Sequence, residues 1–362
     1  MRKTKNYLYV LLCGAGFAVC GNLFAGNEDR SGQAGASELL INPWARSSGW
    51  GGANSANSHG LEATYLNVAG TAFTQKTEIQ FSNTTWLKGT DISINSFGIS
   101  QKLGESSVLG VNMVSMNFGE VDITTTATPE GGIGKFSPRM MNLGLSYAKA
   151  FSTSIYGGIN VKALSEGISN VSAQGIAIDA GIQYVTGIGK TKEGKKKTDN
   201  LKFGISLKNV GPPIRYSGDG LSFKGIVQST GTTLTVQHRS EHFELPSLVN
   251  IGAAYDYLPA EKMRLTFAGT FTSNSFSKDA YQLGAEFAYM NYFMLRAGYY
   301  LEQKTKSLLM ESISSVYSGP SAGFSLNVPF GKGATRSFAI DYSVRFTRIF
   351  DNVHCIGARI NL

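Results

Sequence analysis

Two short stretches of the chain have residue types and spacing that could support chemistry. Residues 189–196 nearly match a phosphate-binding loop, but Lys196 stands where a Ser or Thr would reach Mg²⁺, and no helix follows. His238 and His242 could share a metal ion on a helix, but residues 230–237 are typical of a strand, where this spacing separates two residues by about 13 Å. We therefore expect a solvated basic turn at the first stretch and no metal at the second.

No Ser, Cys or carboxylate pair carries a nucleophile signature, such as a glycine-flanked Ser after a strand. The sequence accordingly predicts no catalytic residue, no cofactor and no metal site, and an enzyme is the weakest of the function classes. The chain has 33 basic and 25 acidic residues. This modest positive balance is spread along the chain, which argues against a nucleic-acid partner.

Residues 1–25 have the layout of a secretory signal peptide. Arg2, Lys3 and Lys5 precede an uncharged apolar run, and Ala25 closes a small-residue end where cleavage is expected. Removing this leader would lower the net charge to +5, because it carries three of the 33 basic residues and none of the acidic ones. It would also leave Cys355 as the last cysteine, so no intrachain disulfide could hold the exported chain.

The elements that must position everything else are strands with strict alternation. Residues 248–303 contain four segments of nine or ten residues in which every second side chain is apolar and the others are polar, small or charged. Such segments are typical of a strand that separates lipid from a wet interior. A soluble β-sandwich would also alternate, so this pattern by itself leaves both architectures open.

Alternation and turn signals together predict fourteen strands from Thr77 onward. The strand that begins near Ser106 is the least regular, because its apolar face changes near Met113, and we expect a bulge there. The expected ranges are 77–87, 90–103, 106–119, 139–151, 153–165, 174–186, 200–210, 248–257, 263–273, 279–290, 293–303, 320–329, 336–347 and 353–362.

The connectors favour a membrane barrel over a sandwich. Long connectors at 120–138, 211–247 and 304–319 fall on one rim, and mostly short turns fall on the other. An even number of strands with loops sorted in this way is the layout of outer-membrane barrels. We therefore expect an all-β, 14-stranded antiparallel transmembrane barrel over residues 77–362, in the outer membrane of a Gram-negative bacterium, with the long loops extracellular and both termini periplasmic.

Residues 26–76 lack alternation and are rich in Gly, Ala, Ser and Asn. Small residues let a backbone pack closely against its surroundings. We interpret this stretch as an N-terminal segment in or near the lumen, and a flexible lead-in is the alternative.

Charged residues on the polar face are expected to pair across the barrel strands. With the turns assumed here, Glu286 stands opposite Arg296 and Asp256 stands opposite Arg264. Each such pair contributes roughly 0.2 to 1 kcal/mol, whereas an Arg placed toward lipid costs about 2 to 4 kcal/mol. We therefore assign these four residues to structural ion pairs in the lumen.

The connector 211–247 is the best candidate for binding a partner. It is long, it contains a hairpin signal at Thr230, Gly231 and Thr232, and it carries exposed apolar groups. Loops of this length usually bind something or act as lids, although a folded cap without a partner is the alternative. Its candidate partner-binding residues are Arg215, Tyr216, Leu221, Phe223 and Ile226.

Six stretches, scattered over most of the chain, resemble the PorV family of the type IX secretion system, which shares the barrel type of FadL fatty-acid transporters. The chain departs from the family pattern at Trp50, where the family has Met, and at Val68, where the family has Pro. The matching stretches are residues 41–53, 84–88, 118–120, 207–212, 244–246 and 295–299.

The resemblance implies a non-enzymatic outer-membrane protein, either PorV itself or a close paralogue such as PorQ. Such a protein binds the C-terminal signal domain of secreted cargo and passes it from the translocon to the attachment complex. Its partners would be the cargo, the translocon and attachment-complex proteins, and outer-membrane lipid. The alternative is a FadL-like transporter of hydrophobic small molecules, which would need an apolar path through the barrel.

Overall fold

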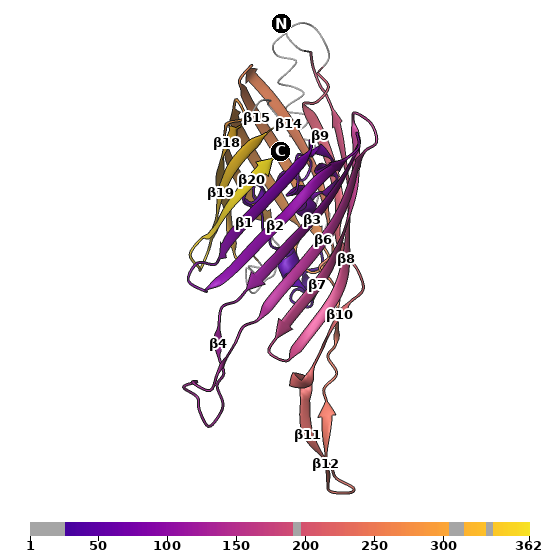
Figure 1. The fold of residues 1–362 in the computed structure, drawn as a ribbon, viewed down its shortest axis with the longest axis vertical. Coiled ribbons are helices and arrows are strands. Elements are labelled where there is room, and N and C mark those ends of the chain that lie inside the picture. Colours follow the sequence, from indigo (N-terminus) through magenta and orange to yellow (C-terminus); the bar gives the residue numbers. More distant parts are fainter. Residues whose placement is uncertain (1–25, 191–196, 304–314, 331–335) are drawn as a thin grey trace.

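The computed structural model describes residues 26–190, 197–303, 315–330 and 336–362, and these form a closed antiparallel β-barrel (Figure 1). The predicted leader and most of the stretch resembling a phosphate loop lie outside the described residues. The wall consists of fourteen long strands: β1 (Thr77–Trp86), β2 (Ile92–Leu103), β3 (Ser107–Asn117), β6 (Arg139–Ala150), β7 (Ile155–Ile168), β8 (Val171–Thr186), β9 (Leu201–Val210), β14 (Leu248–Ala260), β15 (Met263–Asn274), β16 (Ala280–Tyr289), β17 (Phe293–Glu302), β18 (Tyr317–Pro329), β19 (Ser337–Thr347) and β20 (Val353–Asn361).

Hydrogen-bonded neighbours close the wall completely. Wall strands pair with the next wall strand along the chain, and the first strand, β1, pairs with the last, β20, over Glu78 to Thr85. Closure leaves no edge strand in the wall, so the backbone groups of the spanning region are satisfied within the protein. The prediction of a 14-stranded antiparallel barrel is confirmed.

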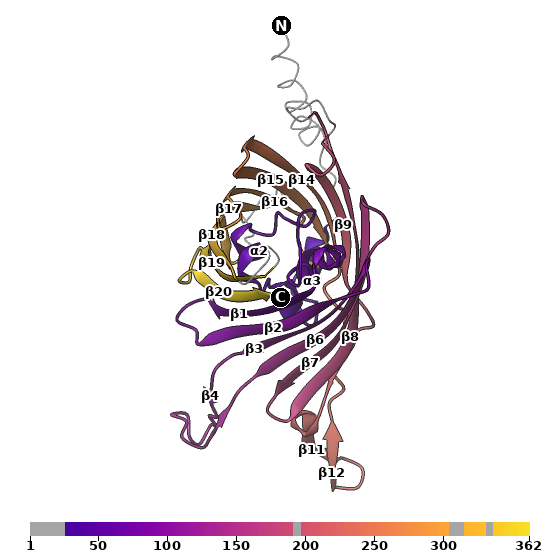
Figure 2. The same ribbon diagram turned by 45° about the horizontal axis from the view of Figure 1, so that its top comes forward.

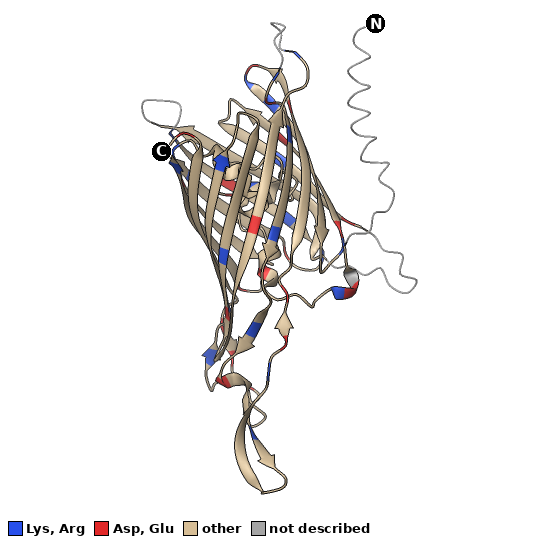
Figure 3. Cartoon of the chain, turned by 90° about the vertical axis from the view of Figure 1, so that its right-hand side faces the viewer, with Lys and Arg blue, Asp and Glu red and all other residues tan. Residues whose placement is uncertain are grey.

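The barrel is apolar outside and polar inside. On β15, Phe267 points outward with half of its surface exposed, whereas its neighbour Thr266 is fully buried toward the lumen. Lumen positions on β14, β16 and β17 hold Asn250, Gln282 and Arg296, all nearly inaccessible. Figure 3 shows few charged residues along the strands. This inverted distribution suits a wall whose outer surface meets hydrocarbon.

The helices of the described residues are all short. Among the described residues, no helix has both the length and the apolar character needed to cross a membrane.

Strand bounds agree with those expected to within about three residues, and two local predictions are wrong. The hairpin between β7 and β8 is tighter than expected, because both strands continue to a turn at Ser169 and Asn170. The bulge expected near Met113 is absent, since β3 keeps an unbroken register with both neighbours. Its lumen side instead carries the apolar Val114 and Met116, which line a small cavity beside the N-terminal segment.

Residues 26–76, which we call the plug, begin at one rim and lie inside the barrel from about Gly35 onward (Figure 2). The plug contains only short elements, because its many small residues and turns favour no long helix. They are η1 (Glu28–Arg30), η2 (Ser37–Leu40), α2 (Ala45–Gly49), α3 (Ala63–Leu66) and η3 (Val68–Phe73). From Gly35 onward most of its residues are buried, among them Ala45, Ala53, Leu61 and Ala69, whereas Asn27, Asp29, Ser31 and Gln33 near its start are exposed.

The plug runs through the barrel from one rim to the other. Near its start, the Asn27 amide donates to the carbonyl oxygen of Asn274 at the rim of the long connectors. At its end the chain enters β1 at the opposite rim, where the Leu362 amide donates to the Thr77 carbonyl oxygen. The expectation that both ends of the leaderless chain share one side is therefore wrong for the described residues, because the plug must cross the lumen to reach Thr77.

Two of the long connectors contain their own strands. The connector 120–138 holds a minimal pair, β4 (Val121–Asp122) and β5 (Lys135–Phe136). The connector 211–247 holds β10 (Ile214–Ser217), η4 (Asp219–Leu221), β11 (Ser222–Val227), β12 (Thr232–Gln237) and β13 (His242–Phe243), so the hairpin predicted at Gly231 is confirmed. Most of the third connector, residues 304–314, lies outside the described residues.

Candidate functional site: the filled lumen and the outer hairpin

The plug approaches the wall closely wherever both carry small residues. Gly49 faces Gly323 on β18, where an added Cβ would lie 3.1 Å from the Gly323 Cα. The Trp50 ring and backbone lie over Gly284 and Gly298, and any side chain at Gly298 would collide with the Trp50 carbonyl oxygen. The small residues that suggested close packing in the sequence are thus the contacts that seat the plug.

A buried ion pair holds the two halves of the plug together. Arg46 Nε lies 2.5 Å from Glu62 Oε1, and Arg46 Nη2 donates to the His59 carbonyl oxygen at 2.6 Å. Burial opposes the charge of Arg46, but the carboxylates of Glu62, Asp341 and Glu78 together raise the pKa of its guanidinium. Arg46 therefore stays charged, and its removal would leave Glu62 buried without its partner.

A second set of ion pairs belongs to the wall, and it confirms one of the two expected pairs. Glu286 stands opposite Arg296 in the β16–β17 register, with Oε2 and Nε 2.6 Å apart. The pairing of Asp256 with Arg264 is wrong. Asp256 binds Lys202 at 2.8 Å, and Arg264 binds Glu286 at 3.1 Å.

The reason for this error is the turn between β14 and β15. The sequence-based register assumed a loop from Leu258 to Lys262, but β14 continues to Ala260 and pairs there with Met263. A register shift between Tyr257 and Ala260 then places Asp256 opposite Thr266 instead of Arg264.

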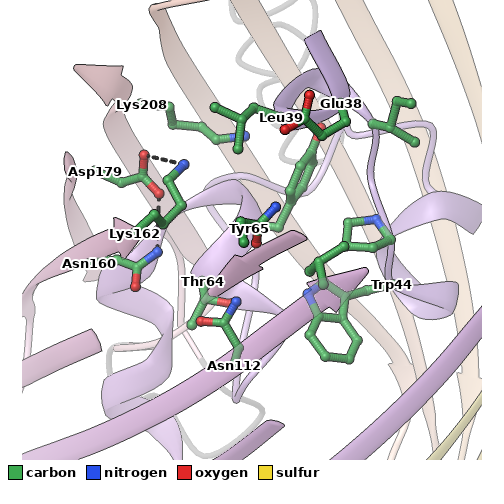
Figure 4. Close-up of a pocket in the computed structure, with 14 residues that line it drawn as sticks. Glu38, Leu39, Trp44, Thr64, Tyr65, Asn112, Asn160, Lys162, Asp179 and Lys208 are labelled. Atoms are coloured by element: carbon green, nitrogen blue, oxygen red, sulfur yellow. Dashed lines mark hydrogen bonds and ion pairs between the residues drawn. The ribbon is translucent and has the colours of Figure 1, made fainter. Parts of the chain in front are cut away.

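A polar cluster lies where β9 departs from β8 near the long-connector rim. The β8–β9 register shifts between Ile178 and Ala180, and Asn209 adopts a left-handed φ of 58°. Its amide donates to Asp179 Oδ1 at 2.7 Å, and Asp179 also pairs with Lys162 at 2.8 Å. The bulge is therefore held by fully partnered buried groups, as in Figure 4, where Lys162 and Asp179 face each other.

Beside this cluster, a cavity separates the plug from the wall. Its volume is about 30 Å³, which is enough for roughly two water molecules. Lys208 enters it from β9 with Nζ 3.6 Å from the centre of the Tyr65 ring, and Figure 4 shows Glu38 of η2 at its edge.

Glu38 is the least satisfied group of this cavity. Neither of its carboxylate oxygens has a hydrogen-bond partner among the described residues. Burial first, and then the negative charge of Glu166, raise its pKa to about 7. Lys162 acts in the opposite direction but does not offset the burial. Glu38 therefore takes up a proton near neutral pH more readily than an exposed glutamate would.

An apolar cluster lies beside the cavity, with which it shares Leu39. It joins the plug to the wall and to the connector 211–247, and Tyr216 and Phe243 pack against it. Its buried members are Ala36, Leu39, Leu164, Ala173, Ala177, Ile214 and Leu245. The base of the connector is thus part of the folded barrel.

The tip of the same connector is exposed. The β11–β12 hairpin extends beyond the rim of the wall (Figure 1), and its side chains are open to solvent almost throughout. Its base is fixed by the His238 amide, which donates to the Leu221 carbonyl oxygen at 2.9 Å. The His238 ring stacks on Phe223 with the ring centres 4.4 Å apart.

The five residues predicted to bind a partner do not form one surface. Arg215 and Tyr216 lie on β10, which pairs with the start of β8, and the Tyr216 hydroxyl donates to Glu166. Leu221 ends η4 at the base of the hairpin, whereas Phe223 and Ile226 lie on opposite faces of the hairpin itself. The structure therefore separates this set into a rim anchor and an exposed tip.

The two histidines of the connector do not converge. His238 contacts Phe223, whereas His242 pairs with Arg215 through the β10–β13 ladder. Within the described ranges, no group of three or more His, Cys, Asp and Glu side chains could hold a metal ion.

Sequence reasoning missed the polar cluster around Glu38, Lys162, Asp179, Lys208 and Asn209. Charged residues at lumen positions of two adjacent strands were an available signal, as they were for Glu286 and Arg296. Their mutual placement depends on the β8–β9 register shift, which has no clear sequence mark.

No protein-family model matches the chain, and no curated protein matches it. The solved CymD monoaromatic hydrocarbon channel is similar with a TM-score of 0.51 at 12% identity, covering 89% of this chain and 97% of CymD. The Pseudomonas putida toluene transporter TodX gives a TM-score of 0.51 at 13% identity, covering 83% of this chain and 92% of TodX. A Pseudomonas aeruginosa FadL homologue gives 0.49 at 12% identity, covering 85% and 96%.

The match to CymD and TodX establishes the fold: this chain is a FadL-type barrel, and a place in the outer membrane is consistent with these neighbours. Their names describe CymD as a monoaromatic hydrocarbon channel and TodX as a toluene transporter. At this level of identity the similarity extends to the fold alone, and none of the comparisons bears on the PorV resemblance beyond the barrel type.

Proposed function

We propose that this protein is a non-enzymatic component of protein export in the outer membrane. In this proposal the rim of the long connectors faces the outside of the cell, where it binds the C-terminal domain of a secreted protein and passes it from the translocon to the attachment complex. The resemblance to the PorV family suggests the role. The observation that supports it best is an uncovered apolar hairpin, β11–β12, on a barrel whose lumen is filled.

The filled lumen makes a simple pore a poor description of this chain. From Gly35 onward the plug is mostly buried, and the cavity of about 30 Å³ beside Glu38 is far smaller than the roughly 300 to 1,000 Å³ of a pocket for an organic ligand. Binding at the rim needs no opening of the lumen, so the geometry favours a partner that docks outside.

The test is deletion of the chromosomal gene, followed by measurement of secreted proteins in the medium and in the periplasm. The proposal expects exported proteins with the C-terminal domain to accumulate in the periplasm. Re-expression of the full chain should restore their release, and re-expression of a chain without residues 222–237 should not. Normal release from the deletion strain would exclude the proposed role.

A second candidate function is transport of hydrophobic small molecules, and the comparisons favour it over the first. CymD and TodX are channels for monoaromatic hydrocarbons and toluene, and they share this fold. The apolar cluster of Leu39, Ile214 and Leu245 at the mouth could receive such a molecule if the plug moved. Uptake of labelled fatty acid or toluene by cells with and without the protein distinguishes the two functions, because an export component should leave uptake unchanged.

A further inference from the structure

The β11–β12 hairpin has one apolar and one polar face. Directly paired residues of an antiparallel ladder share a face. Phe223 pairs with Val236, Gly225 with Leu234, and Val227 with Thr232, so one face is apolar. Its large side chains, Phe223, Val227, Leu234 and Val236, are each 36% to 50% exposed. The opposite face carries Ser222, Lys224, Thr233, Thr235 and Gln237, with Ile226 as its one apolar member.

Among the described residues, no further strand covers the apolar face; the His238 ring stacks on Phe223 but leaves Val227, Leu234 and Val236 exposed. The two strands pair with each other and with no further strand. A two-stranded hairpin is marginally stable by itself and gains independent stability when a third strand or a packed element covers its apolar face. Contiguous exposed apolar groups of this kind mark interaction sites in folded proteins.

The outer edge of β12 is also unprotected. Edge strands usually carry a charge, a proline or a bulge that prevents pairing with other chains. β12 has none of these, because residues Thr232 to Gln237 are uncharged and pair with β11 in unbroken register. The other connector hairpin differs: β4 and β5 have two residues each, and Asp122 pairs with Lys135 there. The free edge of β12 is therefore a template for a further strand.

We propose that β12 accepts an extended strand of the secreted protein as a third strand of this sheet. This inference rests on the proposed export function and names the recognition mode. Main-chain hydrogen bonds to the β12 edge would supply affinity, and alternate apolar side chains of the incoming strand would extend the face of Phe223, Leu234 and Val236. The preferred partner segment is thus an uncharged strand with apolar residues at every second position.

The position of the hairpin argues against two other occupants. Lipid is remote, because the hairpin extends away from the barrel wall (Figure 1). Antiparallel pairing of β12 between two copies would require a two-fold axis perpendicular to the strand. Since the hairpin runs roughly along the long direction of the barrel, the second barrel would point the opposite way, which two barrels in one membrane do not.

The test uses the full-length leaderless protein in detergent and, as the probe, the purified C-terminal domain of an exported protein of the same organism. The variant Leu234→Ser with Val236→Ser removes apolar groups from one face of β12. The matched control, Thr233→Ser with Thr235→Ser, changes the same strand on its other face. We expect the first variant to weaken binding of the domain at least tenfold, and the control to change it less than twofold.

A photo-crosslinking residue at position 234 should link to the domain, and the same residue at position 224 on the polar face should not. Equal binding by both double variants, or crosslinks to lipid or to a second copy, would overturn strand addition at β12 while leaving the export function standing. Failure of the unaltered protein to bind the domain would overturn the export function as well. The heat resistance of each folded barrel in gels checks that every variant is folded.

Discussion

The plug and the β11–β12 hairpin are two chain segments that do not belong to the barrel wall, and they differ in burial. The plug is poor in large apolar residues, yet it is mostly buried from Gly35 onward, because Gly49, Ala53 and Ala56 let its backbone approach the wall. The hairpin carries Phe223, Leu234 and Val236, yet it is exposed. Burial in this protein therefore follows the available space and backbone partners more closely than side-chain hydrophobicity, and the apolar residues left outside are free to bind.

The largest expected difference between the two regions concerns the buried ion pair of the plug. Replacing Arg46 by Ala leaves Glu62 buried without its partner, which should destabilise the seated plug by about 3 to 5 kcal/mol. Hydrogen exchange of residues 45–73, followed by mass spectrometry, measures the effect. Arg215→Ala at the exposed rim is the control and should change exchange by less than about 0.5 kcal/mol. Equal effects of both variants would contradict the contrast between the regions.

The second largest effect is expected where the plug backbone at Trp50 contacts the wall at Gly298. Gly298→Val places a side chain against the Trp50 carbonyl oxygen, and backbone can move less easily than a side chain, so we expect a loss of about 3 kcal/mol in plug seating. Ion conductance across a planar bilayer should rise as the plug loosens. Gly269→Val is the matched control on the lipid face, where an added Cβ meets Leu283 Cδ2 at 3.3 Å. Unchanged conductance in Gly298→Val would show that the plug tolerates this collision.

Seating of the plug should weaken as pH rises toward neutrality. The pKa of Glu38 is about 7 in the folded chain and near 4.5 when exposed, so the folded protein binds the proton more tightly. This stabilisation is complete below about pH 4.5 and is lost as pH rises to about 7, a difference of about 2 to 3 kcal/mol.

Glu38→Gln should remove this dependence, because the amide is uncharged throughout the range. Hydrogen exchange of residues 36–41 at pH 5 and pH 8 compares the variant with the unaltered chain. Lys162, Lys208, Glu166 and Asp179 also lie near this cavity and remain in both proteins, so the variant isolates Glu38. Equal pH dependence in the two proteins would assign the effect to these neighbours.

The smallest effect on stability is expected at the hairpin. Deleting residues 222–237 should change the thermal unfolding of the barrel by less than about 0.5 kcal/mol, because the tip makes few contacts with the rest of the molecule. The apolar cluster with Ile214 and Leu245 at its base stays intact in this variant. A marked loss of barrel stability would mean that the hairpin supports the wall, and the comparison with the plug would no longer hold.

Particular residues show which features of the fold and the site could be predicted from the sequence. Period-two alternation predicted the wall strands, since lipid outside and a polar lumen inside impose opposite chemistries on successive side chains. The same alternation placed Glu286 opposite Arg296, because the short turn at Asn291 leaves little freedom in register. The pair of Asp256 with Arg264 was wrong, because a shift of two residues in the hairpin keeps the same face but exchanges the partner.

The sequence by itself determined the strands, their inward and outward faces, and the hairpin at Gly231, since these depend on local periodicity and turn chemistry. The tertiary structure alone decided the path of the plug from the long-connector rim to Thr77, the cavity beside Glu38, and the separation of Arg215 and Tyr216, held against β8, from Phe223 on the exposed hairpin. These features depend on register shifts and on contacts between residues far apart in the chain. A register shift of two residues keeps every side chain on the same face but changes which groups meet.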